Sequence, residues 1–149
     1  DAGAAAGWGL NTTFVLPIRT GHQLLGQFAI GEGTARYIEA LSGQNLDAIL
    51  TATGALEGVR TQSGNLGYIH KWSATVRSGL SFSTAYVEDD AALPSTAIDR
   101  LMDVRGNVIW TPYRLVDIGG ELLWGDRRNK NGARGDAWRC QFAVIYRLN

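Results

Sequence analysis

Apolar and polar residues alternate with a period of two through the last third of the chain. Within each run between 102 and 148, the even positions are aliphatic, aromatic or small: Met102, Val104, Gly106, Val108, Trp110, Val116, Ile118, Gly120, Leu122, Trp124, Trp138, Cys140, Phe142, Val144, Tyr146 and Leu148. The odd positions are mostly polar: Asp103, Arg105, Asn107, Asp117, Glu121, Arg127, Arg139, Gln141 and Arg147. Successive side chains of a strand point to opposite faces, so this pattern predicts strands with one apolar face and one charged face.

The same alternation predicts earlier strands at 8–18, 22–33, 65–72 and 76–86, in addition to those at 99–110, 116–128 and 136–149. Between 31 and 63 the pattern loosens. There we expect a short helix within 34–41, where apolar residues recur at helical spacing, and two short strands within 47–60. The chain is therefore predicted to be one domain, 1–149, with a flexible lead-in at 1–6 and a long extracellular or pore-lining excursion at 31–63.

Composition excludes some classes of protein. The formal net charge is zero, from 14 basic and 14 acidic residues, so nucleic acid is not an expected partner. No apolar run reaches the roughly 18 residues that a membrane helix needs. Cys140 is the single cysteine, which leaves no internal disulfide. The chain begins at Asp1 with no initiator Met and no export-signal pattern, so we expect a mature, processed or truncated product.

Two all-β architectures fit this pattern. One is an antiparallel up-and-down transmembrane β-barrel, or the C-terminal part of a larger barrel of about 16 strands, with its apolar face toward lipid. The other is a soluble eight-stranded barrel, similar to a lipocalin, whose apolar face turns inward and binds a small apolar ligand. The direction of the even-numbered face distinguishes them.

Aromatic residues and connection lengths favour the transmembrane barrel. Six aromatic residues lie near strand ends on the apolar face, as in a membrane-interface girdle: Trp8, Trp72, Trp110, Trp124, Trp138 and Tyr146. Short connections at 19–21, 73 and 111–114 alternate with longer ones at 31–63, 88–97 and 129–135, as strands running up and down require. Seven strands leave two bare edges, which lipid does not tolerate, so we expect this chain to form part of a larger barrel.

Two groups of residues carry a resemblance to a known family. The segment 107–132, NVIWTPYRLVDIGGELLWGDRRNKNG, followed by Gly135–Asp136–Ala137 and Gln141–Phe142, resembles the C-terminal hairpin of DcaP-like outer-membrane porins. Gly31–Glu32–Gly33 followed by Arg36–Tyr37–Ile38 is similar to that family's signature after an early strand.

This resemblance implies a homotrimer of 16-stranded barrels in the bacterial outer membrane, in contact with outer-membrane lipid. It also implies passive diffusion of small anionic organic solutes through the barrel. The chain departs from the family in being about half the length of such a barrel. It also ends Tyr146–Arg147–Leu148–Asn149, where an aromatic terminal residue is usual.

If the even positions face lipid, charged odd positions face the lumen. The candidate pore-lining and anion-binding residues are Arg36, Arg77, Arg105, Arg139, Glu121 and Asp103, with Asp117 beside them. Arginines around a narrow aqueous pore favour anions and can bind a carboxylate with two hydrogen bonds. The alternative is that these arginines pair with carboxylates on neighbouring strands and stabilise the wall.

Catalytic and metal-binding patterns are lacking in the sequence. His22 and His70 have no partner spacing that suggests a metal site, and no Gly-x-Ser-x-Gly elbow occurs. The acidic run Glu88–Asp90 lacks the spacing of a calcium loop and is expected to be a solvated loop. We therefore expect a protein that is not an enzyme and has no cofactor and no metal.

Overall fold

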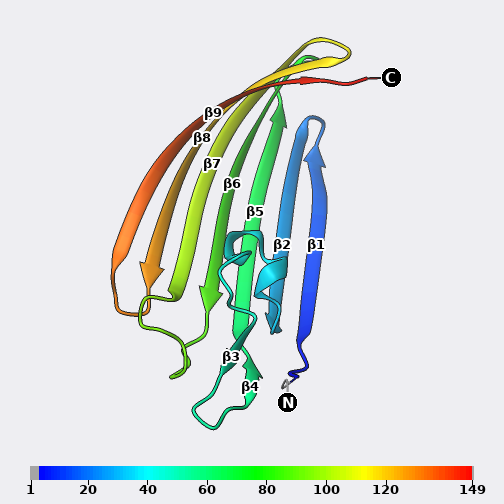
Figure 1. The fold of residues 1–149 in the computed structure, drawn as a ribbon. Coiled ribbons are helices and arrows are strands. Elements are labelled where there is room, and N and C mark those ends of the chain that lie inside the picture. The colour runs from blue at the N-terminus through cyan, green and yellow to red at the C-terminus, as the bar shows by residue number, and fades with distance from the viewer. Residues whose placement is uncertain (1–3, 149) are drawn as a thin grey trace.

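The computed structural model describes residues 4–148, and most of them form one large antiparallel sheet (Figure 1). Its seven strands, in spatial order, are β1 (Trp8–Arg19), β2 (His22–Glu32), β5 (Arg60–Lys71), β6 (Val76–Val87), β7 (Ile98–Tyr113), β8 (Val116–Asn129) and β9 (Arg134–Tyr146). Each strand pairs with the wall strands next to it along the chain, which confirms the predicted all-β, up-and-down architecture. No helix in 4–148 is long and apolar enough to cross a membrane.

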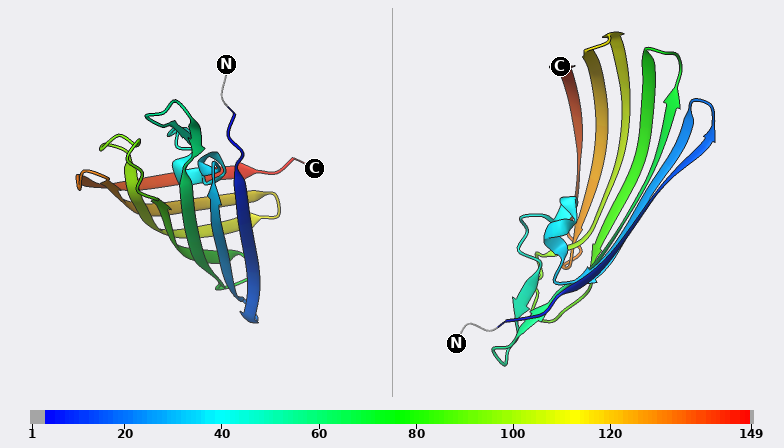
Figure 2. Two further views of the ribbon diagram at one scale, coloured as in Figure 1. Left: turned by 90° about the horizontal axis from the view of Figure 1, so that it is seen from below. Right: turned by 90° about the vertical axis from the view of Figure 1, so that its right-hand side faces the viewer.

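The sheet curves into an open trough rather than a closed barrel (Figure 2). Within the described residues, the outer edges of β1 and β9 have no strand partner. Their backbone N–H and C=O groups along these edges therefore lack the ladder hydrogen bonds that the five inner strands make on both sides. This matches the expectation that the chain is part of a larger barrel.

The two ends of the trough differ in their connections. Turns at 20–21, 72–75 and 114–115 lie at what we call the short-turn end, and segments 33–59, 88–97 and 130–133 lie at the loop end. The strands extend further than the alternation predicted, so the connection expected at 129–135 shortens to 130–133. The turn expected at 111–114 moves to 114–115, because β7 continues to Tyr113.

The even-numbered residues lie on the convex face of the sheet. Their apolar side chains are exposed there: Leu122 is 51% and Phe142 is 72% exposed. The concave face carries the odd-numbered residues, including Asp103 and Arg105. The inward-facing apolar core that the soluble, lipocalin-like alternative requires is therefore absent from the described wall, and that alternative is wrong.

Residues 33–59 leave the wall and fold over its concave face (Figure 2); we call them the inward segment. They form two 3₁₀ helices, η1 (Ala35–Tyr37) and η2 (Glu39–Leu41), and a hairpin of β3 (Ala48–Leu50) and β4 (Leu56–Gly58). The predicted short helix is thus two 3₁₀ turns, separated by Ile38 in extended conformation at φ −95° and ψ 110°. Gly33, at φ +72°, turns the chain off the wall, a conformation that glycine adopts without steric cost.

These boundaries refine the excursion expected at 31–63, because β2 includes Glu32 and β5 begins at Arg60. Of the lead-in expected at 1–6, residues 4–7 precede β1 without regular secondary structure, and residues 1–3 lie outside the described residues.

The principal buried cluster of 4–148 lies between the inward segment and the loop end of the concave face. It comprises Ala35, Ile38, Leu41, Leu46, Ile49, Val59, Ala85, Val87 and Ile98. Leu41 of η2 is 1% exposed and packs among wall residues such as Ala85 and Val87. Backbone hydrogen bonds from Gly33 N to Val59 O and from Val59 N to Asp47 O, both 3.0 Å, fasten the base of the segment. The inward segment is therefore packed onto the wall by hydrophobic burial as well as by hydrogen bonds.

Candidate pore lining

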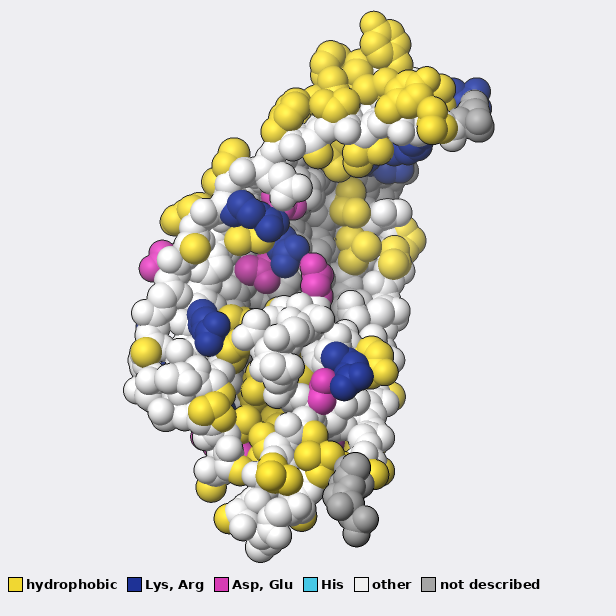
Figure 3. Space-filling view, viewed as in Figure 1, with side chains coloured by type: hydrophobic (Ala, Val, Ile, Leu, Met, Phe, Trp, Pro, Cys, Tyr) yellow, Lys and Arg dark blue, Asp and Glu magenta, His cyan; other side chains and the backbone are white. Residues whose placement is uncertain are grey.

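Charged side chains gather in the hollow of the concave face (Figure 3). On β7, Arg105 Nε donates a 2.7 Å hydrogen bond to Asp103 Oδ1, two residues back on the same face of the strand. On β9, Arg139 Nη2 donates a 3.3 Å hydrogen bond to Glu121 of β8. The sheet register places Arg105, Leu123 and Arg139 opposite one another in a single row across three strands. Four of the predicted pore-lining residues are thus brought together.

Four arginines line the larger groove of the concave face, which has a volume of about 650 Å³. At odd-numbered positions they are Arg105, Arg127 and Arg139, with the carboxylate of Asp103 and the apolar side chains of Leu101 and Leu123. Arg134, Asp126 and Asp136 line the same groove from even-numbered positions. Arg127 was not among the predicted site residues, although its odd position placed it on the charged face. Its Nε donates to the Asn129 side-chain oxygen at 2.7 Å, and it forms no ion pair with any described residue.

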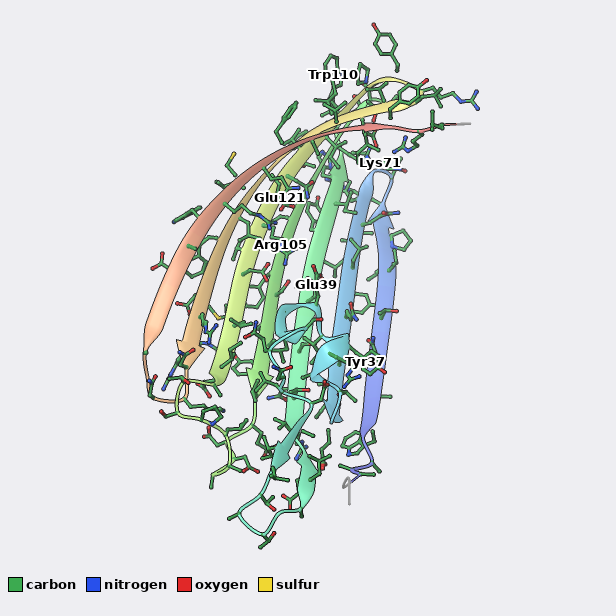
Figure 4. The ribbon with its side chains drawn as sticks, in the orientation of Figure 1. Tyr37, Glu39, Lys71, Arg105, Trp110 and Glu121 are labelled. Carbon is green, nitrogen blue, oxygen red and sulfur yellow. The ribbon has the colours of Figure 1, made fainter. Side chains whose placement is uncertain are left out.

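A second groove, of about 200 Å³, lies between the wall and the inward segment. Tyr37 and Glu39 line it from the inward segment, and Arg105 lines it from β7 (Figure 4). The polar residues among the rest of its lining are Gln27, Ser63, Asn65, Ser83, Thr84 and Asp103, and the larger apolar ones are Ile38 and Leu101. Tyr37 and Glu39 were not predicted as site residues, because nothing in the alternation shows where a loop of this length folds back.

Arg77 belongs to a different cluster, at the short-turn end. Asp117 is 3% exposed and accepts hydrogen bonds from Thr111 Oγ1 at 2.6 Å, from Arg77 Nη2 at 2.9 Å and from Arg147. Arg77 also donates to Thr111 at 3.2 Å. These contacts join β6, β7, β8 and the residue after β9. Arg77 thus makes the kind of ion pair between strands that the sequence left as the alternative to pore lining.

Arg36 also lies apart from the central groups. Its backbone N–H and its Nε both donate to the Asp47 carboxylate at 2.9 Å, which closes the inward segment between η1 and β3. The Arg36 side chain remains 64% exposed. The structure thus gives Arg36 a local partner rather than a place in either groove.

The six predicted girdle residues divide evenly between the two ends of the convex face. Trp8, Trp124 and Trp138 lie toward the loop end, and Trp124 is directly opposite Trp138 in the register of β8 and β9. Trp72, Trp110 and Tyr146 lie at the short-turn end, where Trp72 Nε1 donates to Ser78 Oγ at 2.9 Å. Tyr86, at an even-numbered position near the loop end of β6, adds to the first group and was not predicted. Two aromatic bands separated by an apolar surface are the arrangement that membrane interfaces favour.

Comparison with known proteins is consistent with this geometry. A family model described as DcaP outer membrane protein matches residues 3–148. The fold is similar to a solved structure described as the outer membrane channel DcaP of Acinetobacter baumannii, with a TM-score of 0.82 at 18% sequence identity. The match covers 94% of this chain and 40% of that one. A search of curated protein sequences found no match. The chain therefore belongs to the DcaP family of bacterial outer membrane proteins.

Proposed function

We propose that the concave face forms part of the lining of an outer-membrane channel through which small anionic organic solutes diffuse. The observation that carries this proposal is the 650 Å³ groove, to which the odd-numbered positions of the wall contribute three arginines and one carboxylate, Asp103. Asp103 and Glu121 already accept hydrogen bonds from Arg105 and Arg139. Because a guanidinium has five N–H donors, each arginine keeps donors for a passing solute.

The geometry of these arginines suits carboxylates. The Arg139 side chain is 56% exposed and makes one hydrogen bond to Glu121, and Arg127 has no carboxylate partner among the described residues. A planar guanidinium can donate two parallel hydrogen bonds to one carboxylate. A row of such groups lowers the electrostatic cost of moving an anion through a narrow water-filled passage.

The channel needs more wall than this chain supplies. The chain spans 40% of the length of the solved channel, and β1 and β9 have bare outer edges within the described residues. Backbone groups cannot be left unpaired in lipid, so further strands must pair with β1 and β9 to close the wall. We also propose a homotrimer, as the resemblance implies; chemical cross-linking of the membrane-embedded protein tests it, and monomers alone would contradict it.

Ion selectivity in planar bilayers tests the channel proposal. The protein is purified from outer membranes, and the reversal potential is measured under a salt gradient. The wild type should favour chloride, and the combined variant Arg127→Gln with Arg139→Gln should shift the reversal potential toward potassium. Arg60→Gln, which removes one positive charge from a separate groove at the loop end, is the control for each single substitution. An unchanged reversal potential in the double variant would exclude these arginines as the selectivity determinants.

A further inference from the structure

Three arginines lie side by side on the convex face at the loop end. The register pairs Arg100 of β7 with Arg128 of β8, and Arg128 with Arg134 of β9. Tyr86 of β6 continues the same row, opposite Arg100. Like charges directly opposite one another on a sheet repel, so a row of three guanidiniums needs a compensating anion.

One compensating carboxylate is buried in the next row of the same face, toward the short-turn end. Asp126, two residues before Arg128 on the same face, is 3% exposed. It accepts a 2.6 Å hydrogen bond from Arg134 and lies 3.6 Å from Arg100 Nη2. Asp126 therefore fixes the two outer arginines from the membrane side, while the Arg128 and Arg134 side chains stay 54% and 61% exposed.

The position of this row relative to the apolar surface is specific. Moving from the arginines toward the short-turn end, the next row holds Met102, Asp126 and Asp136, and the row after it holds Val104, Trp124 and Trp138. The arginines thus lie just beyond the tryptophan pair that marks the loop-end boundary of the apolar surface. In outer-membrane barrels the longer loops face the outside, so this level corresponds to the headgroups of the outer leaflet.

We propose that Arg128 and Arg134 bind the phosphate groups of the phosphorylated glycolipid in the outer leaflet. Asp126 orients Arg134 and Arg100 in this row. Arginine is the side chain best suited to phosphate, because its planar fork gives two charge-assisted hydrogen bonds to neighbouring oxygens. Phosphate at a membrane surface is a common partner of basic side chains placed next to an apolar surface. The acyl chains of the same lipid would lie against Trp124, Trp138 and the apolar rows beyond them.

Two carboxylates oppose binding at the edges of this site. Asp136 is exposed and lies opposite Asp126, on the membrane side of Arg134. Asp99 lies 3.5 Å from Arg128 Nε, but it also accepts a hydrogen bond from Lys130 at 3.1 Å. The outward-facing charge is therefore set mainly by Arg128, Arg134 and Asp136. Replacing Asp136 should change lipid binding in the opposite direction to replacing Arg128.

Native mass spectrometry of the detergent-solubilised protein tests the proposal, with diphosphorylated lipid A and its dephosphorylated form as probes. We expect Arg128→Gln to weaken binding of the diphosphorylated lipid about tenfold, as loss of one charge-assisted contact implies. Asp136→Asn should strengthen binding. The control is Arg114→Gln, which removes the same charge in the turn at the opposite end of the wall and should bind as the wild type does.

Three results would overturn the proposal. The first is equal binding of the phosphorylated and dephosphorylated lipids, and the second is wild-type affinity in Arg128→Gln. The third is complete displacement of the lipid by millimolar inorganic phosphate, which would identify a simple anion site in place of a lipid site. Arg128→Gln is suited to the test because, among residues 4–148, the ion-pair contact of Arg128 is the long one to Asp99 at 3.5 Å, so we expect the variant to fold.

Discussion

The carbonyl oxygen of Trp8 lies 2.5 Å from the position that a Cβ atom on Gly31 would occupy. The Cα of Gly9, which is opposite Gly31 in the register of β1 and β2, lies 2.8 Å from the same position. Both neighbours are backbone atoms of an adjacent strand, so they cannot rotate away as a side chain would. The first glycine of the Gly31–Glu32–Gly33 motif is therefore required by the close approach of β1 at the point where the inward segment begins.

Replacing Gly31 by Ala should destabilise the wall by about 1–3 kcal/mol, because overpacking forces the backbone of β1 to move. Urea unfolding in detergent, followed by tryptophan fluorescence, measures the change. Gly64→Ala on β5 is the matched control, since no described atom lies within 4 Å of its added Cβ. Equal stability of the two variants would show that β1 adjusts without cost.

Convex and concave positions should respond differently to a new charge. Leu122 lies on the convex face and its neighbour Leu123 lines the arginine groove on the concave face. An arginine facing lipid near the membrane midplane costs about 2–4 kcal/mol in barrels of this kind. Leu122→Arg should therefore lower folding yield into vesicles strongly, and Leu123→Arg should lower it little. Similar yields for both variants would contradict the assignment of the convex face to lipid.

Glu39 should oppose the selectivity that the arginines create. It lines the same groove as Arg105 and is the carboxylate that the inward segment contributes there. Replacing it with Gln removes a negative charge from the passage, so anion preference in planar bilayers should increase. Glu57→Gln, in the hairpin strand β4, serves as the control with the same change of charge. A shift toward potassium in Glu39→Gln would contradict a solute path along this groove.

Asp117 should be needed for the stability of the short-turn end. Its carboxylate joins Thr111, Arg77 and Arg147, and Asp117→Asn would leave both arginines without that anionic partner. Leaving a buried charge without its counter-ion lowers the free energy of unfolding by more than the intact ion pair adds to it. We expect a lower melting temperature in detergent. Asp90→Asn, in the loop 88–97, should melt as the wild type does.

Lys130, in the loop 130–133, holds that loop against the loop 88–97 at the loop end of the wall. The Lys130 side chain is 10% exposed. Its ammonium donates a hydrogen bond to the Val87 carbonyl and lies 3.1 Å from the Asp99 carboxylate and 2.8 Å from the Asp89 carboxylate. The hydrogen bond from Lys130 holds the pKa of Asp89 below its ordinary value of 3.8. A lowered pKa in the folded state means that this contact contributes at neutral pH and is lost as acid protonates Asp89.

Protease digestion of the loop 88–97 in reconstituted protein should therefore stay constant above about pH 4 and increase below it, measured with an acid-active protease. The increase should be small, because the Asp89 side chain is 88% exposed and exposed ion pairs contribute little. Lys130→Met should increase digestion at every pH, because it also removes the contacts with Val87 and Asp99. Digestion that is independent of both pH and this substitution would show that other contacts hold the loop.

The alternation predicted which face each wall residue occupies, because side-chain parity along a strand is a local property. Glu121 and Leu122, for example, were predicted to lie on opposite faces. Glu121 lies on the concave face and Leu122 on the convex face. The partners of the charged residues could not be predicted in the same way. Arg77 meets Asp117 only because two intervening strand registers place them together. The row of Arg100, Arg128 and Arg134 likewise depends on the registers of β7 with β8 and of β8 with β9.

The path of the inward segment could not be predicted from local sequence patterns either. The sequence indicated a pore-lining excursion and a short helix, but the residues that reach the groove depend on how Leu41 and Ile38 pack against the wall. That packing is long-range and leaves no periodic signature in the sequence.

Because the inward segment is held by Leu41, Ile38 and their buried neighbours, the exposed residues of its tip, Tyr37, Glu39 and Ala40, can vary without disturbing the attachment to the wall. The width of the passage and the charge it presents are then set by a few residues that no wall strand depends on. Related proteins could thus acquire new solute ranges by exchanging this tip alone, while the lipid-facing surface and the interstrand ion pairs stay the same. In this fold, the residues that would set the range of solutes are different from those that hold the wall in the membrane, so the two sets can change independently.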